Sequence, residues 1–338
     1  MNRALLTFAF VVSIFATTSA SADVRLVGSG ASFPFPLYAA WFQDFSKKTP
    51  GVTVDYQSKG SGAGINDFTN QIVAFAGSDA AMSDEQIDKV KNGVVLLPMT
   101  AGEIVVAYNL QGIEELRLPR DIYSDIFLGK IERWNDPRIA AANEGADLPD
   151  LPITVVVRSD SSGTTFNFTN HLAAINPEFE SGPGTGTTVQ WPRSNRFVRA
   201  PKNDGVTATI VQTPGAIGYI EYGFAKLTNT PTALLENKAG NFVPAGTAGG
   251  SAALATAEFD EHMRAFVTDP EGEEPYPIVT FTWLLFNETG QDAQTVDAIK
   301  QMIEYGLTDG QEMAEDLGYV PLPDVVVEKV RVKMDRIQ

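Results

Sequence analysis

A short polar stretch between two apolar segments carries the side chains best suited to chemistry. It runs from Arg158 to Asn167 and reads RSDSSGTTFN. The apolar run 153–157 before it predicts a buried strand, and 166–172 after it predicts the start of a helix. Such a loop leaves backbone N–H groups free at the positive end of the helix dipole. Because Arg158 adds a planar fork of charged donors, we expect one side of a site for a small tetrahedral anion.

Two other loops of small residues also follow predicted strands. They are 28–32, which reads GSGAS, and 60–64, which reads GSGAG. Phe33 stands where a dinucleotide-binding loop has its third glycine, and no lysine follows the second loop as in a triphosphate-binding loop. By composition the second loop is either a flexible turn or the approach to a helix that begins at Ile65 and offers free N–H groups.

A third predicted strand, 73–79, ends in polar residues, and Asp79 is the last of them. Ser83 and Gln86 then predict a capping box for the next helix, which carries Ile87 and Val90. Asp79 is either a turn residue or a carboxylate that faces a ligand.

The order of the elements predicts an α/β fold. Strands alternate with helices throughout, as in parallel sheets covered on both faces. Further strands are expected at 94–99, 104–108 and 278–286, and the glycine- and alanine-rich stretch 238–255 predicts a surface excursion. Open α/β sheets bind ligands beyond the carboxyl ends of their strands, which is where the polar loops fall.

Composition narrows the function. The formal net charge of −17 argues against a nucleic-acid partner, which needs a basic surface. The absence of cysteine excludes disulfides and thiol catalysis, and the two histidines, His171 and His262, match no zinc spacing. We therefore expect no metal and no cofactor.

The first 22 residues predict a signal peptide. A basic start precedes the apolar run 4–16, and Ala20-Ser21-Ala22 has the small-x-small form of a cleavage site. We expect a mature chain that begins at Asp23, has no lipid anchor and lies in a Gram-negative periplasm. A retained membrane anchor is the alternative. Removing 22 of 338 residues leaves 316, which is enough for two domains.

In their order and spacing, these motifs resemble the phosphate-binding proteins of periplasmic phosphate import systems, the solute-binding proteins of ABC transporters. The resemblance covers nearly the whole chain after the signal peptide. It rests on 28–34, 60–64, 77–79, 128–134, 158–166, 203–205 and 214–219.

The resemblance implies a two-lobed periplasmic-binding-protein fold of type II. Each lobe is a sheet flanked by helices, and hinge strands connect the lobes near 105–108 and 279–286. The first lobe is then discontinuous, with 23–106 and 281–338, and the second lobe is 107–280. The implied partners are inorganic phosphate and the permease subunits of an ABC transporter, and the protein is a monomer and not an enzyme.

The resemblance also implies a site made of hydrogen bonds. Asp79 matches a carboxylate that accepts a proton from bound phosphate, and Asp160 matches an acidic partner of Arg158. Ser32 replaces a threonine that is common in the family, and 193–199 is more basic than expected, which leaves the electrostatics of the cleft open. The implied phosphate-binding residues are Ser32, Phe33, Ser61, Asp79, Arg158, Asp160, Ser162, Gly163 and Thr164.

Three alternatives stay open. The first is a binding protein for another oxyanion, such as sulfate, molybdate or tungstate, none of which carries a proton near neutral pH. The second is a secreted phosphate scavenger without a transporter. The third is a serine hydrolase that uses Ser162, His171 and Asp160, although the G-x-S-x-G elbow is missing.

Overall fold

The computed structural model describes residues 23–338, so the predicted signal peptide at 1–22 lies outside the described residues. Eight strands form one sheet in the order β2-β1-β3-β11-β4-β8-β6-β7. They are β1 (Val24–Gly30), β2 (Val52–Ser58), β3 (Phe75–Ser78), β4 (Val94–Tyr108), β6 (Thr154–Arg158), β7 (Phe197–Ala200), β8 (Ala216–Glu221) and β11 (Val279–Asn287). A small sheet contains β5 (Arg117–Leu118), β9 (Leu234–Glu236) and β10 (Phe242–Val243).

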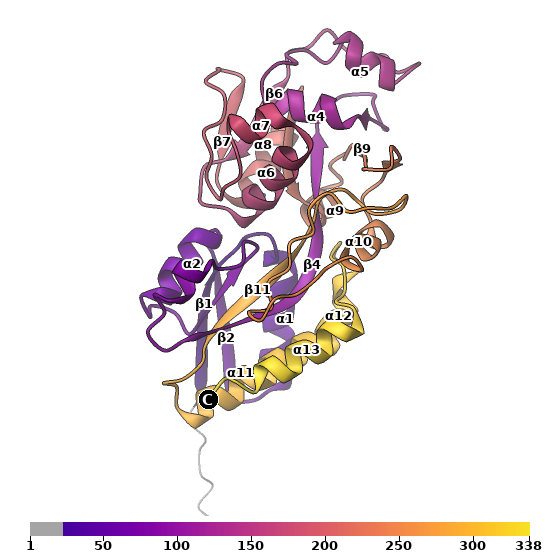
Figure 1. Ribbon diagram of the computed structural model, residues 1–338. Coiled ribbons are helices and arrows are strands. Elements are labelled where there is room, and N and C mark those ends of the chain that lie inside the picture. The colour runs from indigo at the N-terminus through magenta and orange to yellow at the C-terminus, as the bar shows by residue number, and fades with distance from the viewer. Residues whose placement is uncertain (1–22) are drawn as a thin grey trace, which may run out of the picture.

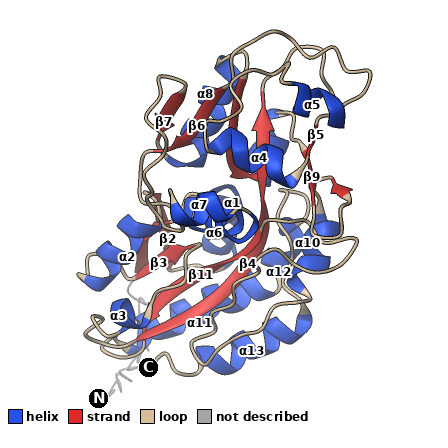
Figure 2. Cartoon of the chain, turned by 45° about the horizontal axis from the view of Figure 1, so that its top comes forward, coloured by secondary structure: helices blue, strands red, loops and turns tan. Residues whose placement is uncertain are grey.

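Helices flank the large sheet along its whole length, both at β1, β2 and β3 and at β6, β7 and β8 (Figures 1 and 2). Within residues 23–338 every helix is too short or too polar to span a bilayer. The helices are α1 (Phe35–Lys48), α2 (Ser61–Thr69), α3 (Asp84–Ile87), α4 (Arg120–Phe127), α5 (Pro137–Ala142), α6 (Gly163–Ile175), α7 (Pro177–Ser181), α8 (Lys202–Gln212), α9 (Tyr222–Thr228), α10 (Thr247–Leu254), α11 (Ala293–Leu307), α12 (Asp309–Ala314) and α13 (Asp324–Met334).

One long strand, β4, connects two lobes. The first lobe contains β1, β2 and β3, and the second contains β6, β7 and β8. Every residue of β4 is buried. The strand pairs with β11 along 94–103 and with β8 along 104–108, so it runs from one lobe into the other (Figure 1). The apolar runs at 94–99 and 104–108 therefore belong to one strand, because the residues between them continue the ladder.

Parallel pairing is found within each lobe but not between them. In the first lobe β1 pairs in parallel with β2 and β3, and in the second lobe β6 pairs in parallel with β7 and β8. The pairs β3–β11, β11–β4 and β4–β8 are antiparallel. The prediction of parallel sheets thus holds for β1, β2 and β3 and for β6, β7 and β8, whereas β4 and β11 add antiparallel pairs.

Two helices begin one turn earlier than predicted. Helix α2 begins at Ser61 instead of Ile65, and α6 begins at Gly163 instead of Phe166. The hydroxyl of Ser162 accepts a hydrogen bond from the N–H of Thr165, which caps α6. The small polar residues of both loops therefore belong to the first helical turns. The capping box at Ser83 is confirmed, but its helix, α3, ends before Val90.

The predicted surface excursion at 238–255 is exposed at 238–241 but is not a loop throughout. It contains β10 and α10, and the glycines of α10 pack closely against neighbouring residues. A Cβ atom at Gly250 would lie 2.4 Å from Val320, and one at Gly249 would lie 3.2 Å from Tyr276. The small residues here allow close helix packing rather than an exposed loop.

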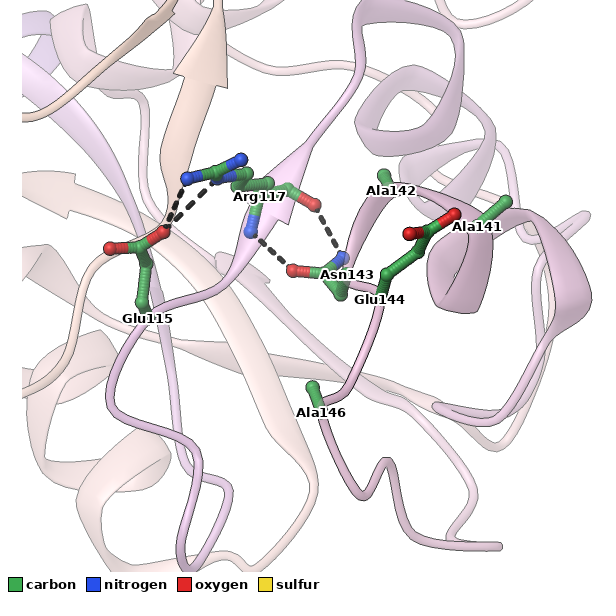
Figure 3. A pocket seen from close by; sticks show the side chains of 7 residues that line it. All are labelled: Glu115, Arg117, Ala141, Ala142, Asn143, Glu144 and Ala146. Carbon is green, nitrogen blue, oxygen red and sulfur yellow. Dashed lines mark hydrogen bonds and ion pairs between the residues drawn. The ribbon is translucent and has the colours of Figure 1, made fainter.

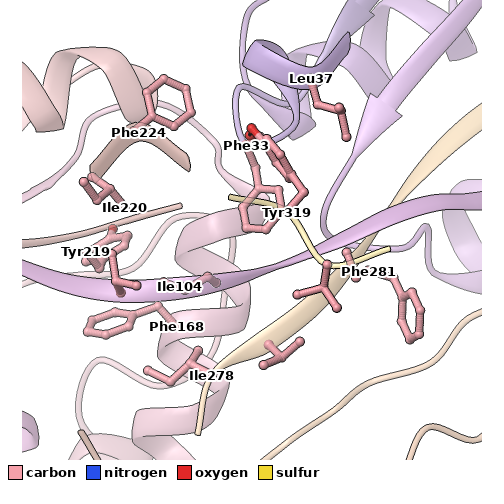
Figure 4. Packing of buried hydrophobic residues seen from close by; sticks show 14 of the residues in the cluster. Phe33, Leu37, Ile104, Phe168, Tyr219, Ile220, Phe224, Ile278, Phe281 and Tyr319 are labelled. Atoms are coloured by element: carbon pink, nitrogen blue, oxygen red, sulfur yellow. Dashed lines mark hydrogen bonds between the residues drawn. The ribbon is translucent and has the colours of Figure 1, made fainter. Parts of the chain in front are cut away.

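A buried apolar core extends through both lobes (Figure 4). In the first lobe Phe33 and Tyr319 pack edge to face, with ring centroids 6.3 Å apart. In the second lobe Phe168 stacks on Tyr219 at 4.3 Å. Ile104 of β4 is fully buried where this strand changes its partner. Aromatic packing therefore supports the loops at the carboxyl ends of β1 and β6.

Gly30, the last residue of β1, gives a test of this packing. Its φ is +143°, and a Cβ atom would lie 2.1 Å from the carbonyl oxygen of Gly77. We expect Gly30→Ala to lower the free energy of unfolding by more than about 3 kcal/mol, measured by urea denaturation. Gly112→Ala is the control, because its φ is +80° with no atom within 4 Å, and should cost only about 1–2 kcal/mol. Equal losses would contradict the close approach of β1 and β3.

Candidate anion-binding site

Residues of both lobes meet in one buried cluster at the carboxyl ends of β1, β3 and β6. The hydroxyl of Ser61 accepts hydrogen bonds from the N–H groups of Gly163 at 3.0 Å and Asp79 at 3.3 Å. The hydroxyl of Ser32 accepts one from the N–H of Asn203 at 3.1 Å. Together with the bonds of Arg158 and Asn203, they bring together Ser32, Ser61, Asp79, Arg158, Asp160, Gly163 and Thr164.

Arg158, at the end of β6, is held by two partners. Its Nε and Nη2 donate to the two carboxylate oxygens of Asp160 at 2.9 and 2.6 Å. Its Nη1 donates to the hydroxyl of Thr164 at 3.3 Å. Burial raises the pKa of Asp160, but the hydrogen bond and charge of Arg158 outweigh it and hold this pKa below its usual value. Asp160 therefore stays ionised and orients the guanidinium.

Asp79 follows β3 and is 1% exposed. One carboxylate oxygen accepts a hydrogen bond from the hydroxyl of Thr282 at 3.0 Å, and the other lies 3.5 Å from the hydroxyl of Ser61. Burial raises the pKa of Asp79 to about 7, because these bonds do not compensate for lost hydration. This carboxyl can accept or release a proton near neutral pH.

The other predicted residues adjoin the cluster in different ways. Ser162 is fully buried, and its hydroxyl caps α6. The ring of Phe33 is buried against Tyr319, so Phe33 can contribute to a site only through its backbone. For all nine predicted residues, the binding of an anion stays a prediction.

Sequence reasoning missed three residues of the cluster. Asn203 donates to Ser32, and Asn167 donates to the carbonyl oxygen of Asp79 at 2.7 Å. Thr282 belongs to β11 and bonds to Asp79. The motif at 203–205 could have indicated Asn203 as a site residue. Thr282 could not be found from the sequence, because a threonine within an apolar strand is recognisable as a site residue only when the neighbours of that strand are known.

The basic segment 193–199 contacts other parts of the second lobe. The guanidinium of Arg196 donates to the carbonyl oxygen of Gly129 at 3.0 Å and to Glu132 at 3.1 Å. Arg193 and Arg199 are exposed. Among the described residues, the arginine whose side chain hydrogen-bonds within the cluster is Arg158.

The geometry argues against the serine hydrolase. The ring nitrogen Nε2 of His171 lies 2.7 Å from the hydroxyl of Tyr123, and burial lowers the pKa of this histidine to about 4. Ser162 uses its hydroxyl as a helix cap instead of bonding to the histidine. The three residues do not form a catalytic triad.

A separate hollow of about 450 Å³ lies beside α5, away from the cluster (Figure 3). Arg117 on its wall is paired with Glu115 at 2.9 Å, and the amide of Asn143 bonds to the main chain of Arg117. Because these polar groups already have partners, this hollow is a poor candidate for an anion site.

Comparisons with known proteins agree with this arrangement. Residues 16–309 match the model of the PBP superfamily domain. The chain is 35% identical over 337 residues to "Phosphate-binding protein PstS" of Pasteurella multocida, covering 98% of this chain and 96% of the relative. It is 36% identical over 310 residues to the protein of the same name from Haemophilus influenzae. This match covers 90% of this chain and 91% of the relative.

Solved structures show the same fold. A periplasmic phosphate-binding protein, PfluDING, bound with phosphate, has a TM-score of 0.76 at 23% identity, covering 91% of this chain and 93% of the other. Another match is a putative phosphate ABC transporter substrate-binding protein from Clostridium perfringens with bound phosphate. Its TM-score is 0.63 at 15% identity, and the match covers 88% of this chain and 100% of the other.

The raised pKa of Asp79 predicts a dependence of stability on pH. Between pH of about 4 and 7 the native state keeps a proton that the unfolded chain has released, so the free energy of unfolding falls as pH rises. The loss is on the order of 4 kcal/mol. Asp79→Asn should therefore stabilise the ligand-free protein more at pH 8 than at pH 4.5, measured by urea denaturation. Asp55→Asn, at a partly exposed position, is the control. A pH-independent difference would contradict the assignment.

Proposed function

We propose that this chain, which belongs to the PstS phosphate-binding proteins of the PBP superfamily, binds inorganic phosphate and delivers it to an ABC importer. The observation that carries the proposal is the buried cluster between the lobes. It combines N–H and hydroxyl donors and one arginine with a single carboxyl acceptor, Asp79.

Asp79 is the group that selects phosphate. A carboxylate can only accept a hydrogen bond, and phosphate near neutral pH still carries a proton that it can donate. Sulfate, molybdate and tungstate carry none, so their oxygens would face an unmatched buried negative charge. This chemistry favours phosphate over the other oxyanions.

Hydrogen bonds are sufficient to hold the anion. In the proposal Ser32, Phe33, Ser61, Ser162, Gly163 and Thr164 donate from their backbone or hydroxyl groups, Arg158 supplies the charge, and Asp160 orients it. Among residues 23–338 no group of three or more metal-binding side chains is present. The net charge of −17 would repel phosphate at long range, so the attraction is local.

Uptake and release follow from motion of the lobes. We place the first lobe at 23–106 and 281–338 and the second at 107–280, a division supported by the change of partner along β4 at 103–104. The hydrogen bonds from Gly163 to Ser61 and from Asn203 to Ser32 connect the lobes. Opening breaks them and exposes the anion, as in other hinge proteins.

The place of action is the periplasm, after removal of the signal peptide at 1–22. The partners are the permease subunits of the transporter, and the protein acts as a monomer. The periplasmic phosphate-binding protein PfluDING shares the fold, which supports this location. A phosphate scavenger without a transporter is the alternative, and a gene neighbourhood without a permease and an ATPase would favour it.

Replacing Asp79 with asparagine tests the selectivity. Isothermal titration of the wild-type protein should show phosphate bound about 10⁴–10⁵-fold more tightly than sulfate. In Asp79→Asn this ratio should fall by at least about 100-fold, because the amide can donate to sulfate. Asp67→Asn, which removes a charge paired with Lys59, is the control and should keep the ratio. An unchanged ratio in Asp79→Asn would remove this residue from the role.

Replacing Arg158 with alanine tests the cation. We expect phosphate affinity to fall by about 100-fold or more, because bonds from a charged donor are lost. The melting temperature of the ligand-free protein should barely move. Arg196→Ala, which removes a partly buried guanidinium from the second lobe, should leave affinity within about threefold. A large loss of ligand-free stability in Arg158→Ala would favour a structural ion pair instead.

A further inference from the structure

We propose that Asn203 is a positioning residue that turns the hydroxyl protons of Ser32 and Thr164 toward the bound anion. The inference rests on the proposed function and concerns a residue that does not itself have to touch phosphate. It follows from the direction of each hydrogen bond in the cluster.

The side-chain amide of Asn203 has only one possible orientation. Its carbonyl oxygen accepts a hydrogen bond from the N–H of Glu221 at 2.9 Å. A backbone N–H can only donate, so the amide oxygen must face Glu221. The amide nitrogen, with its two protons, therefore faces the opposite way. It lies 3.0 Å from the hydroxyl oxygen of Ser32 and 3.2 Å from that of Thr164. One of its two protons is donated to each hydroxyl.

Ser32 consequently has both lone pairs occupied. Its hydroxyl oxygen accepts from the backbone N–H of Asn203 at 3.1 Å and from the side-chain amide at 3.0 Å. A hydroxyl has two acceptor positions and one proton, so only the proton remains free to bond. Ser32 is 1% exposed, and buried donors require an acceptor. Within the described part of the chain, its hydroxyl takes part in hydrogen bonds only as an acceptor.

Thr164 has the same arrangement. Its hydroxyl oxygen accepts from the amide of Asn203 at 3.2 Å and from the guanidinium of Arg158 at 3.3 Å. Ser61 differs from these two residues. The N–H groups of Gly163 and Asp79 occupy its acceptor positions, but its proton faces the carboxylate of Asp79, whose oxygen lies 3.5 Å away. The amide of Asn203 therefore occupies acceptor positions of two hydroxyls, those of Ser32 and Thr164, and leaves their protons for another acceptor.

The arrangement also links orientation to closure. Ser32 belongs to the first lobe, whereas Asn203 and Thr164 belong to the second. The backbone N–H and amide of Asn203 reach Ser32 only when the lobes are together. The proton of Ser32 is therefore directed at the anion in the closed state and is free to rotate in the open one.

A double-mutant cycle tests the proposal. Phosphate affinity is measured by titration for the wild-type protein, Ser32→Ala, Asn203→Ala and the double variant. We expect Asn203→Ala alone to weaken binding by about 10- to 100-fold, because two donors to a charged ligand lose their orientation. If Asn203 acts through Ser32, the fold-loss of phosphate affinity in the double variant is about tenfold smaller than the product of the fold-losses in the two single variants. Thr164→Val and Asn203→Ala should show the same shortfall.

Asn167→Ala is the matched control. Its amide also crosses between the lobes, but it bonds to the carbonyl oxygens of Asp79 and Gly163 and to no hydroxyl. In the double variant of Asn167→Ala and Ser32→Ala, the fold-loss of phosphate affinity should therefore equal the product of the two single fold-losses. If the losses of Asn203→Ala and Ser32→Ala also multiply, Asn203 has only a structural role and the inference is overturned. If the wild-type protein takes up no phosphate in the same titration, the proposed function fails first.

Discussion

A buried carboxyl group that takes its hydrogen bonds from hydroxyls is the constraint on which this structure depends. Asp79 lies between the lobes with Thr282 and Ser61 beside it, while the guanidinium of Arg158 is held by Asp160. Transferring a carboxylate out of water is costly unless its charge is matched. The raised pKa of Asp79 is the result. A site of this kind favours a guest that brings its own proton.

The sheet places that carboxyl. Strand β3 ends at Ser78, directly before Asp79, and the neighbouring β11 supplies Thr282. Strand β4 pairs with β11 in the first lobe and with β8 in the second, so the two lobes share one buried ladder. The first turns of α2 and α6 then face one another, with Ser61 against Gly163. Donors from helix N-termini provide local attraction in a protein whose net charge of −17 is unfavourable for an anion.

The cluster separates two tasks among its polar side chains. Asp160 and Asn203 hold other groups in place, whereas Arg158 and the hydroxyls of Ser32 and Thr164 are the groups that they hold. In the proposed function, the energy for binding comes from donors that are already oriented, which lowers the entropy cost of ordering them around the ligand. Asn203 fits this scheme because its amide bonds to both lobes at once.

The sequence by itself determined the local features. Apolar runs followed by small polar residues indicate strand, turn and helix, and these patterns predicted β1, β3, β6 and the loops that form the cluster. The resemblance extended this to two lobes and to nine residues. Seven of the nine, namely Ser32, Ser61, Asp79, Arg158, Asp160, Gly163 and Thr164, form hydrogen bonds with one another or through Asn203. The family is shown by the comparisons, which agree with the resemblance.

Only the tertiary structure decided which side chains meet. Thr282 lies 203 positions from Asp79, and Asn203 lies 171 positions from Ser32. No local period connects residues so far apart, because their contact depends on the order of strands in the sheet and on the crossing of β4. The continuous strand at 94–108, the early starts of α2 and α6 and the packed glycines of α10 were missed for a related reason. Packing against distant segments stabilises these elements where their own composition indicates a loop.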